Sequence, residues 1–162
     1  MARNAIIQVR NLTAGYGEDA VILHDISFDV YEGEIFVILG GSGCGKSTLL
    51  KHLIGLIPPM AGEVIIDGDD ISRCSEETFH RILKKIGISY QGGALFGSMT
   101  LAENVGLPIE EYTDLPEKSM AALIKMKLSL VQLDGFENHL PSEISGGMQK
   151  RAGLARAMAL NP

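Results

Sequence analysis

The stretch Gly40-Gly41-Ser42-Gly43-Cys44-Gly45-Lys46-Ser47-Thr48 fits the pattern G-x-x-x-x-G-K-[ST], the P-loop or Walker A motif that binds phosphate. The pattern carries meaning only between a strand and a helix, and both flanks comply. Residues 35–39 form an unbroken apolar run, which predicts a parallel strand buried on both faces. After the loop, apolar side chains recur at helical spacing at Leu49, Leu53 and Ile57. The stretch therefore predicts a strand, a phosphate loop and a helix in succession.

Each part of this loop has an expected contact with a nucleoside triphosphate. Its glycines allow positive φ and close backbone approach, so that successive N–H groups point toward phosphate. The positive end of the following helix adds to this attraction. Lys46 is expected to reach the β- and γ-phosphates, Ser47 to ligate Mg²⁺, and Thr48 to contact the α-phosphate. The loop alone does not say which base is bound or what the energy drives.

Length and composition predict one ordinary globular domain. The chain has 162 residues, of which 46% are apolar, and its net charge is −6 from 14 basic and 20 acidic side chains. This acidic balance argues against a nucleic-acid partner. No apolar run approaches the roughly 20 residues that cross a bilayer, and residues 1–4 lead straight into strand-like sequence without a signal peptide. We therefore expect a cytoplasmic protein whose membrane role, if it has one, depends on a partner chain.

The first half of the chain reads as a small antiparallel β-layer that leads into a parallel core. Residues 5–10 and 21–31 are predicted strands, and 63–68 is a third, short one. Ser75 can cap a helix that runs to about Lys85. Residues 86–90 then read as another core strand, and Gln91 follows at its carboxyl end, where open α/β sheets bind ligands.

The second half is predicted to be helical. Residues 101–106 could form a short helix, and 116–133 carry apolar side chains at helical spacing. Residues 144–148 read Ile-Ser-Gly-Gly-Met, a serine and two glycines that open a last helix. Such a helix start attracts anions by the same physics as the P-loop, although alone it is a common capped helix.

Together, the two motifs resemble the ATP-binding subunits of ABC transporters, whose signature is Leu-Ser-Gly-Gly-Gln. Ile144 stands for the leucine of that signature, and Met148 replaces the usual glutamine. The resemblance implies that Tyr16 stacks on adenine and that Gln91 contacts Mg²⁺ and the attacking water while sensing a transmembrane partner. It also assigns nucleotide contacts to the signature residues Ser145, Gly146 and Gly147. Without the resemblance, Tyr16 would be a turn aromatic and Gln91 a polar residue at a strand end.

The resemblance implies a fold, partners and a location. The fold is a P-loop NTPase of ABC type, with an antiparallel β-layer, a parallel core sheet and an inserted helical subdomain. Its expected parts are the β-layer and P-loop core at 1–91, the helical subdomain at 92–150 and the return to the core at 151–162. Two such subunits pair head to tail, so that the signature of one meets the γ-phosphate on the P-loop of the other. Transmembrane permease subunits would hold the pair at the inner face of the bacterial inner membrane.

A finer resemblance points to the Mla/Mce-type lipid-transport ATPases. It rests on residues 91–96, which read Gln-Gly-Gly-Ala-Leu-Phe, and on residues 141–148, which end in the signature methionine. The resemblance implies phospholipid or related lipid traffic across the bacterial envelope. It adds lipid-binding Mce-type subunits and small regulatory subunits as partners.

The sequence departs from the family at its end. In the family a hydrophobic strand follows the signature helix and ends in Asp-Glu, whereas this sequence ends at Leu160-Asn161-Pro162. We therefore expect a partial domain that lacks its C-terminal part and binds ATP with little or no hydrolysis. The alternatives are an ABC importer or exporter ATPase for another substrate and a catalytically silent nucleotide-binding module. The related ATPases of chromosome and DNA-repair machines interrupt this domain with a long coiled coil. Here Gln91 and Ser145 are only 54 positions apart, with no sustained heptads between them, which argues against that class.

Overall fold

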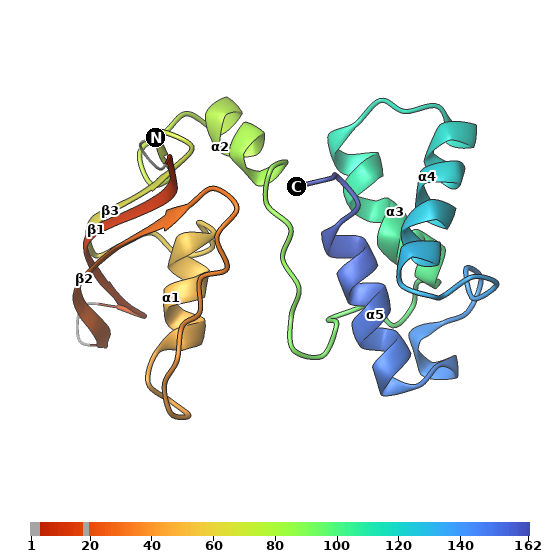
Figure 1. Cartoon of the computed structure of the whole chain (residues 1–162), viewed down its shortest axis with the longest axis horizontal. Helices are drawn as coiled ribbons and strands as arrows, with labels where there is room; N and C mark the ends of the chain where they lie inside the picture. The colour runs from red at the N-terminus through yellow and green to blue at the C-terminus, as the bar shows by residue number, and fades with distance from the viewer. Residues whose placement is uncertain (1–3, 18–19) are drawn as a thin grey trace. The chain divides into compact units, whose positions relative to one another are not determined.

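The computed structural model describes residues 4–17 and 20–162. The chain forms two compact units, Met1–Leu83 and Lys84–Pro162 (Figure 1). The first unit contains the sheet and the P-loop, and the second contains the helical half of the sequence. The predicted subdomain bounds at 92–150 concern the complete ABC fold and stay a prediction.

A four-stranded antiparallel sheet forms the frame of the first unit. Its strands are β1 (Ala5–Gly15), β2 (Val21–Tyr31), β3 (Ala61–Ile66) and β4 (Asp69–Asp70), in the spatial order β2-β1-β3-β4. β1 pairs antiparallel with both β2 and β3. The predicted antiparallel layer is therefore confirmed, and the third strand begins two residues earlier than expected.

Two helices accompany this sheet. α1 (Lys46–Leu53) begins directly at the P-loop lysine and contacts β1. It buries Leu49 and Leu53, while Ile54 already lies beyond the helix and Ile57 follows a turn at Gly55. α2 (Glu76–Leu83) begins after Ser75, whose hydroxyl accepts the Thr78 N–H at 3.3 Å, as the capping pattern predicts.

Two of the predicted strands do not form. Residues 35–39 and 86–90 have no regular secondary structure, and neither pairs with a strand in the described part of the chain. The first run is exposed rather than buried, with Ile35 at 91% and Leu39 at 87% exposure. Within this run, the Phe36 ring stacks on Phe28 of β2 with 5.0 Å between the ring centroids. A parallel strand forms only beside a neighbouring strand to which it can hydrogen-bond, and an apolar sequence alone does not provide that neighbour.

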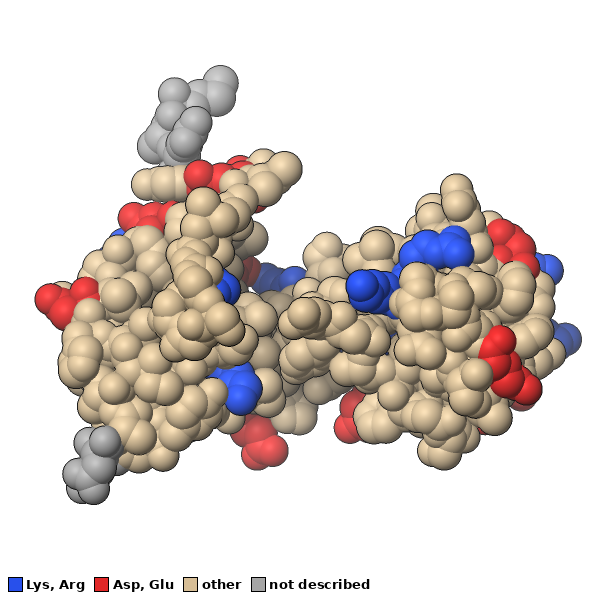
Figure 2. All heavy atoms as spheres, turned by 90° about the horizontal axis from the view of Figure 1, so that it is seen from below, with Lys and Arg blue, Asp and Glu red and all other residues tan. Residues whose placement is uncertain are grey.

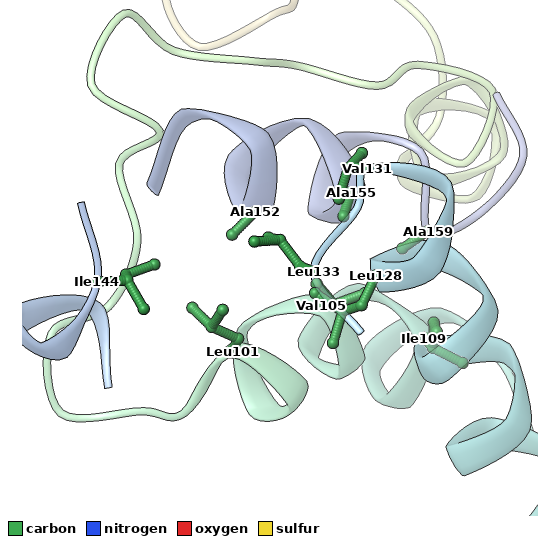
Figure 3. Close-up of a cluster of buried hydrophobic side chains, with 10 residues drawn as sticks. All are labelled: Leu101, Val105, Ile109, Leu128, Val131, Leu133, Ile144, Ala152, Ala155 and Ala159. Carbon is green, nitrogen blue, oxygen red and sulfur yellow. The ribbon is translucent and has the colours of Figure 1, made fainter. Parts of the chain in front are cut away.

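The second unit packs three main helices around one apolar core. These are α3 (Leu101–Tyr112), α4 (Glu117–Leu130) and α5 (Gly146–Ala157), with the single 3₁₀ turn η1 (Pro141–Glu143) before α5. Figure 3 shows the core side chains converging from these helices and from the segments between them. They are Leu101, Val105, Ile109, Leu128, Val131, Leu133, Ile144, Ala152, Ala155 and Ala159.

α3 is twice as long as predicted. It starts with a capping box in which Thr100 Oγ1 accepts the Glu103 N–H at 3.2 Å and the Glu103 carboxylate accepts the Thr100 N–H at 2.7 Å. The helix continues through Pro108, because buried Val105 and Ile109 hold both sides of the proline in the core. Tertiary packing thus overrides a local helix breaker.

On the face drawn in Figure 2, which leaves residues 1–3 and 18–19 aside, acidic and basic side chains are interspersed among uncharged ones. Across the part of the chain that the structure describes, no helix is both long and apolar enough to traverse a bilayer.

The helical core generates a stability prediction that compares two leucines of α4. Leu128 is fully buried, whereas Leu130, two positions later, is 64% exposed. We expect Leu128→Ala to lower the free energy of unfolding by about 2–5 kcal/mol, because it removes buried methyl groups and leaves a cavity. Leu130→Ala should change it by less than about 0.5 kcal/mol. Urea denaturation followed by circular dichroism measures both, and equal losses would contradict the packing described.

Candidate nucleotide-binding site

The P-loop joins the apolar run 35–39 to helix α1 through a bend whose backbone conformation favours glycine. Gly43 and Gly45 have φ values of 81° and 95°, in the left-handed region that other residues avoid. At Gly40 a side chain would collide with the Cys44 sulfur. Gly45 is the N-cap of α1 and provides no side-chain cap, so the first turn of the helix begins with N–H groups turned toward the loop. This arrangement is a helix start built to receive an anion.

Lys46 is held by the loop itself. Its ammonium donates to the backbone carbonyls of Gly40 at 2.8 Å and Gly41 at 2.7 Å. The side chain therefore folds back over the loop at the start of α1. A phosphate group at this helix end would replace the two neutral carbonyl acceptors of this ammonium by a charged acceptor. Hydrogen bonds to charged acceptors are stronger than those to neutral ones.

Tyr16, at the end of β1, is brought to the same helix. Its hydroxyl accepts from Thr48 Oγ1 at 3.3 Å and from the Lys51 ammonium at 3.2 Å. The tyrosine remains about half exposed, and the Lys51 ammonium lies 5.1 Å from the centre of its ring. Sequence reasoning found Tyr16 and Thr48 but missed Lys51, which is three residues after Thr48 and therefore on the same face of α1.

These two donors change the acidity of the phenol. The hydrogen bond from Thr48, followed by that from Lys51, lowers the pKa of Tyr16 below its ordinary value of 10.0, because both favour the phenolate. The same bonds fix the direction of the ring relative to α1. Tyr16 is thus oriented by two side chains of α1.

The residues present fit a magnesium ion held mainly by a nucleotide. The Ser47 hydroxyl is exposed in the first turn of α1, beside Lys46. Mg²⁺ usually takes one or two protein oxygens and fills its other positions with phosphate oxygens and water. Among residues 4–17 and 20–162, no three His, Cys, Asp or Glu side chains gather in a metal-holding group.

The other predicted site residues lie in the second unit. Gln91 is exposed at the start of a turn in which the Gly93 N–H donates to the Tyr90 carbonyl at 2.9 Å. Ser145 is the N-cap of α5 and accepts the Met148 N–H at 3.3 Å, while Gly146 and Gly147 form the exposed first turn. The serine and glycines thus form the helix start that the signature predicts. These residues belong to the second unit, and the P-loop belongs to the first.

A comparison with protein families matches residues 23–162 to the family described as ABC transporter. The chain belongs to the ABC transporter family. The match begins in β2 and includes both the P-loop and the signature helix. It confirms the family that the two motifs predicted.

Curated relatives carry two kinds of name. A protein of Mycobacterium leprae named "Probable ribonucleotide transport ATP-binding protein mkl" is 46% identical over 162 residues, all of this chain and 46% of the relative. The "Intermembrane phospholipid transport system ATP-binding protein MlaF" of Haemophilus influenzae is 45% identical over 157 residues, 97% of this chain and 59% of the relative. The chain thus spans about half the length of the curated relatives it matches. The predicted resemblance to the Mla group is confirmed.

Solved structures confirm the fold class. A dimeric post-hydrolysis state of the ATP-binding cassette MJ0796, bound to ADP and Pi, superposes with a TM-score of 0.87 at 33% identity. The match covers 96% of this chain and 70% of that structure. CbiO1 of Clostridium perfringens, part of the transporter complex cbiONQ, matches with a TM-score of 0.82 at 25% identity, over 98% of this chain and 63% of that one. The P-loop NTPase fold of ABC type is therefore shown.

The contact between Lys51 and Tyr16 predicts a change in tyrosine titration. Replacing Lys51 by Met removes one donor and one positive charge, so the pKa of Tyr16 should rise toward its ordinary value, with Thr48 still lowering it. Alkaline titration of phenolate absorbance measures this shift, and subtracting the curve of a Tyr16→Phe variant isolates Tyr16. Lys125→Met, an exposed lysine in α4, is the matched control. If both lysine variants leave the Tyr16 curve unchanged, the described contact does not exist in solution.

Proposed function

We propose that this chain is the nucleotide-binding part of an ATP-driven transporter that moves phospholipid across the bacterial envelope. The observation that carries the proposal is the glycine-bent loop at residues 40–45, which places Lys46 and Ser47 at the uncapped start of α1. The relation to MlaF, whose name states intermembrane phospholipid transport, supports the substrate.

In this proposal the first unit binds Mg-ATP. The N–H groups of residues 41–47 surround the β- and γ-phosphates, and Lys46 leaves the Gly40 and Gly41 carbonyls to pair with them. Ser47 contributes an oxygen ligand to Mg²⁺, which neutralises charge on the phosphates. Tyr16, held by Thr48 and Lys51, offers its exposed face to the adenine ring. Base stacking on an aromatic side chain is typically worth about 1–3 kcal/mol.

The second unit then acts on the nucleotide of a second subunit. Ser145 and the amides of Gly146 and Gly147 would approach the γ-phosphate bound to the second subunit, as an anion-receptive helix start does. The dimeric structure of the MJ0796 cassette supports such a pairing. Gln91 would orient the attacking water and contact Mg²⁺, and hydrolysis belongs to the complete protein. We place the pair at the inner face of the inner membrane, with permease, Mce-type and small regulatory subunits as partners.

The transported substrate has two candidates among the relatives. The mycobacterial relative is named for ribonucleotide transport, whereas the MlaF relatives of Haemophilus influenzae and Escherichia coli are named for phospholipid transport. The signature methionine, Met148, is the sequence feature that favours the lipid group. We therefore propose phospholipid as the transported substrate, and transport of ribonucleotide is the alternative outcome of the test.

The proposal predicts that transport of labelled phospholipid depends on Lys46. The full-length protein, purified with its membrane subunits and placed in vesicles of phosphatidylethanolamine and phosphatidylglycerol, should move labelled lipid only with Mg-ATP. Lys46→Ala should reduce both ATP turnover and lipid transfer by at least about a hundredfold, because it removes the charge that pairs with the γ-phosphate. Lys125→Ala should leave both unchanged. ATP turnover stimulated by ribonucleotides and indifferent to lipid would contradict the proposed substrate.

Phe96 provides a separate test of the permease contact. Its ring is 51% exposed at the end of the segment that starts at Gln91, where we place the coupling surface. Phe96→Asp should uncouple lipid transfer from ATP hydrolysis in the assembled transporter, because a charge does not pack in an apolar contact. ATP binding by the chain should remain unchanged, and its loss would contradict this assignment.

A further inference from the structure

The turn that carries Gln91 has an unusual backbone. Gly93 and Ala94 have φ values of 80° and 46°, so the chain reverses within a few residues, and the Gly93 N–H closes the turn on Tyr90. Gly93 is buried, although Gln91 and Gly92 before it are exposed. The end of the turn is therefore packed against something, while Gln91 is presented to solvent.

The partner of the turn is helix α5. A Cβ on Gly153 would lie 2.6 Å from the Gly93 Cα, and a Cβ on Gly93 would lie 2.5 Å from the Gln149 carbonyl oxygen. Both distances are too short for real side chains, so the two backbones touch because both positions are glycine. Gly87, upstream of the turn, meets the Ala157 carbonyl in the same way. Figure 1 shows the segment before α3 passing along α5.

Arg156 adds a hydrogen bond to this contact between the turn and α5. Its guanidinium Nη2 donates to the Gly93 carbonyl at 3.0 Å, and its Cζ lies 5.7 Å from the centre of the Phe96 ring. Partial burial lowers the pKa of Arg156, and the nearby Tyr90 opposes that change, so the group stays charged. A hydrogen bond from a charged donor in a half-buried place is stronger than a neutral one.

Asn104 of α3 holds the other end of the same segment. Its buried amide accepts the Phe96 N–H at 2.8 Å and donates to the carbonyls of Phe96, Met99 and Thr100 at 3.0–3.1 Å. Every polar atom of this fully buried side chain therefore faces the segment. Residues 93–100 are thus attached to the helices at both ends, and Gln91 lies only two residues outside the attached part.

We propose that Arg156 is a positioning residue that fixes the turn bearing Gln91 to α5, the helix that begins at Ser145. The proposal rests on the proposed function, in which both Gln91 and Ser145 act on nucleotide. Arg156 lies in the last turn of α5, at the opposite end from the N-cap Ser145, and it holds the turn through the Gly93 carbonyl.

The test compares two arginines of α5 in the full-length protein. Arg156→Met removes the bond to Gly93, whereas Arg151→Met removes bonds of the same kind to the Val131 and Gln132 carbonyls, at 2.7 and 2.9 Å, away from the turn. Arg156→Met should speed amide hydrogen exchange of residues 92–96 about tenfold or more. It should also lower kcat for ATP about tenfold without raising KM, because Gln91 is misplaced and the P-loop is intact. Arg156→Lys, which keeps a donor, should restore part of both.

A second variant separates positioning from stability. Gly153→Ala adds a methyl group against Gly93 and displaces the turn, although alanine is the better helix former. It should therefore lower kcat while the helical content, measured by circular dichroism, stays unchanged. Unchanged exchange at residues 92–96 in Arg156→Met, or an equal loss of kcat in Arg151→Met, would overturn the proposal. If the unmutated protein turns over no ATP, the proposed function fails, and the exchange comparison still decides whether Arg156 holds the turn.

Discussion

The backbone bend at Gly43 and Gly45 is the constraint on which the nucleotide site depends. Both residues have positive φ, and the second is the N-cap of α1, so the helix starts directly at Lys46 without a competing side-chain cap. A residue with a Cβ at Gly45 would also meet Ile22 and Leu23 of β2 at 2.9 Å. The loop therefore takes its shape from glycine and its location from the sheet. Lys46, whose ammonium donates to the Gly40 and Gly41 carbonyls, lies over this loop.

The two units follow different physical principles. In the first, hydrogen bonding of the antiparallel sheet sets the frame, and the apolar run 35–39 remains outside it with exposed side chains. In the second, burial of side chains from α3, α4 and α5 sets the frame, and polar groups such as Asn104 attach the connecting segment. The P-loop lies in the first unit, and the signature helix lies in the second. In the proposed function, recognition of nucleotide and response to it are therefore built on separate cores.

The sequence predicted the elements whose signals are local. The P-loop, the signature serine as an N-cap, the helix after Ser75 and the antiparallel pairing of the first strands were all predicted from residue pattern. The full length of α3 was not predicted, since residues 101–106 were interpreted as a short helix and the capping box at Thr100 and Glu103 was overlooked. Strands at 35–39 and 86–90 were predicted wrongly. An apolar run indicates that a segment can be buried, but it does not show that a neighbouring strand is there to pair with it. Contacts such as Lys51 with Tyr16 and Arg156 with Gly93 depend on tertiary proximity, which single-sequence patterns do not contain.

The central claim is that the loop around Lys46 recognises the outer phosphates of a nucleotide. Isothermal titration of the chain with ATP, ADP and AMP in the presence of Mg²⁺ tests it most directly. The account predicts the tightest binding for ATP, weaker binding for ADP and little for AMP, since each phosphate removed takes away contacts with the loop amides and with Lys46. Equal affinity for all three nucleotides would show that the base alone is recognised, and it would contradict the account.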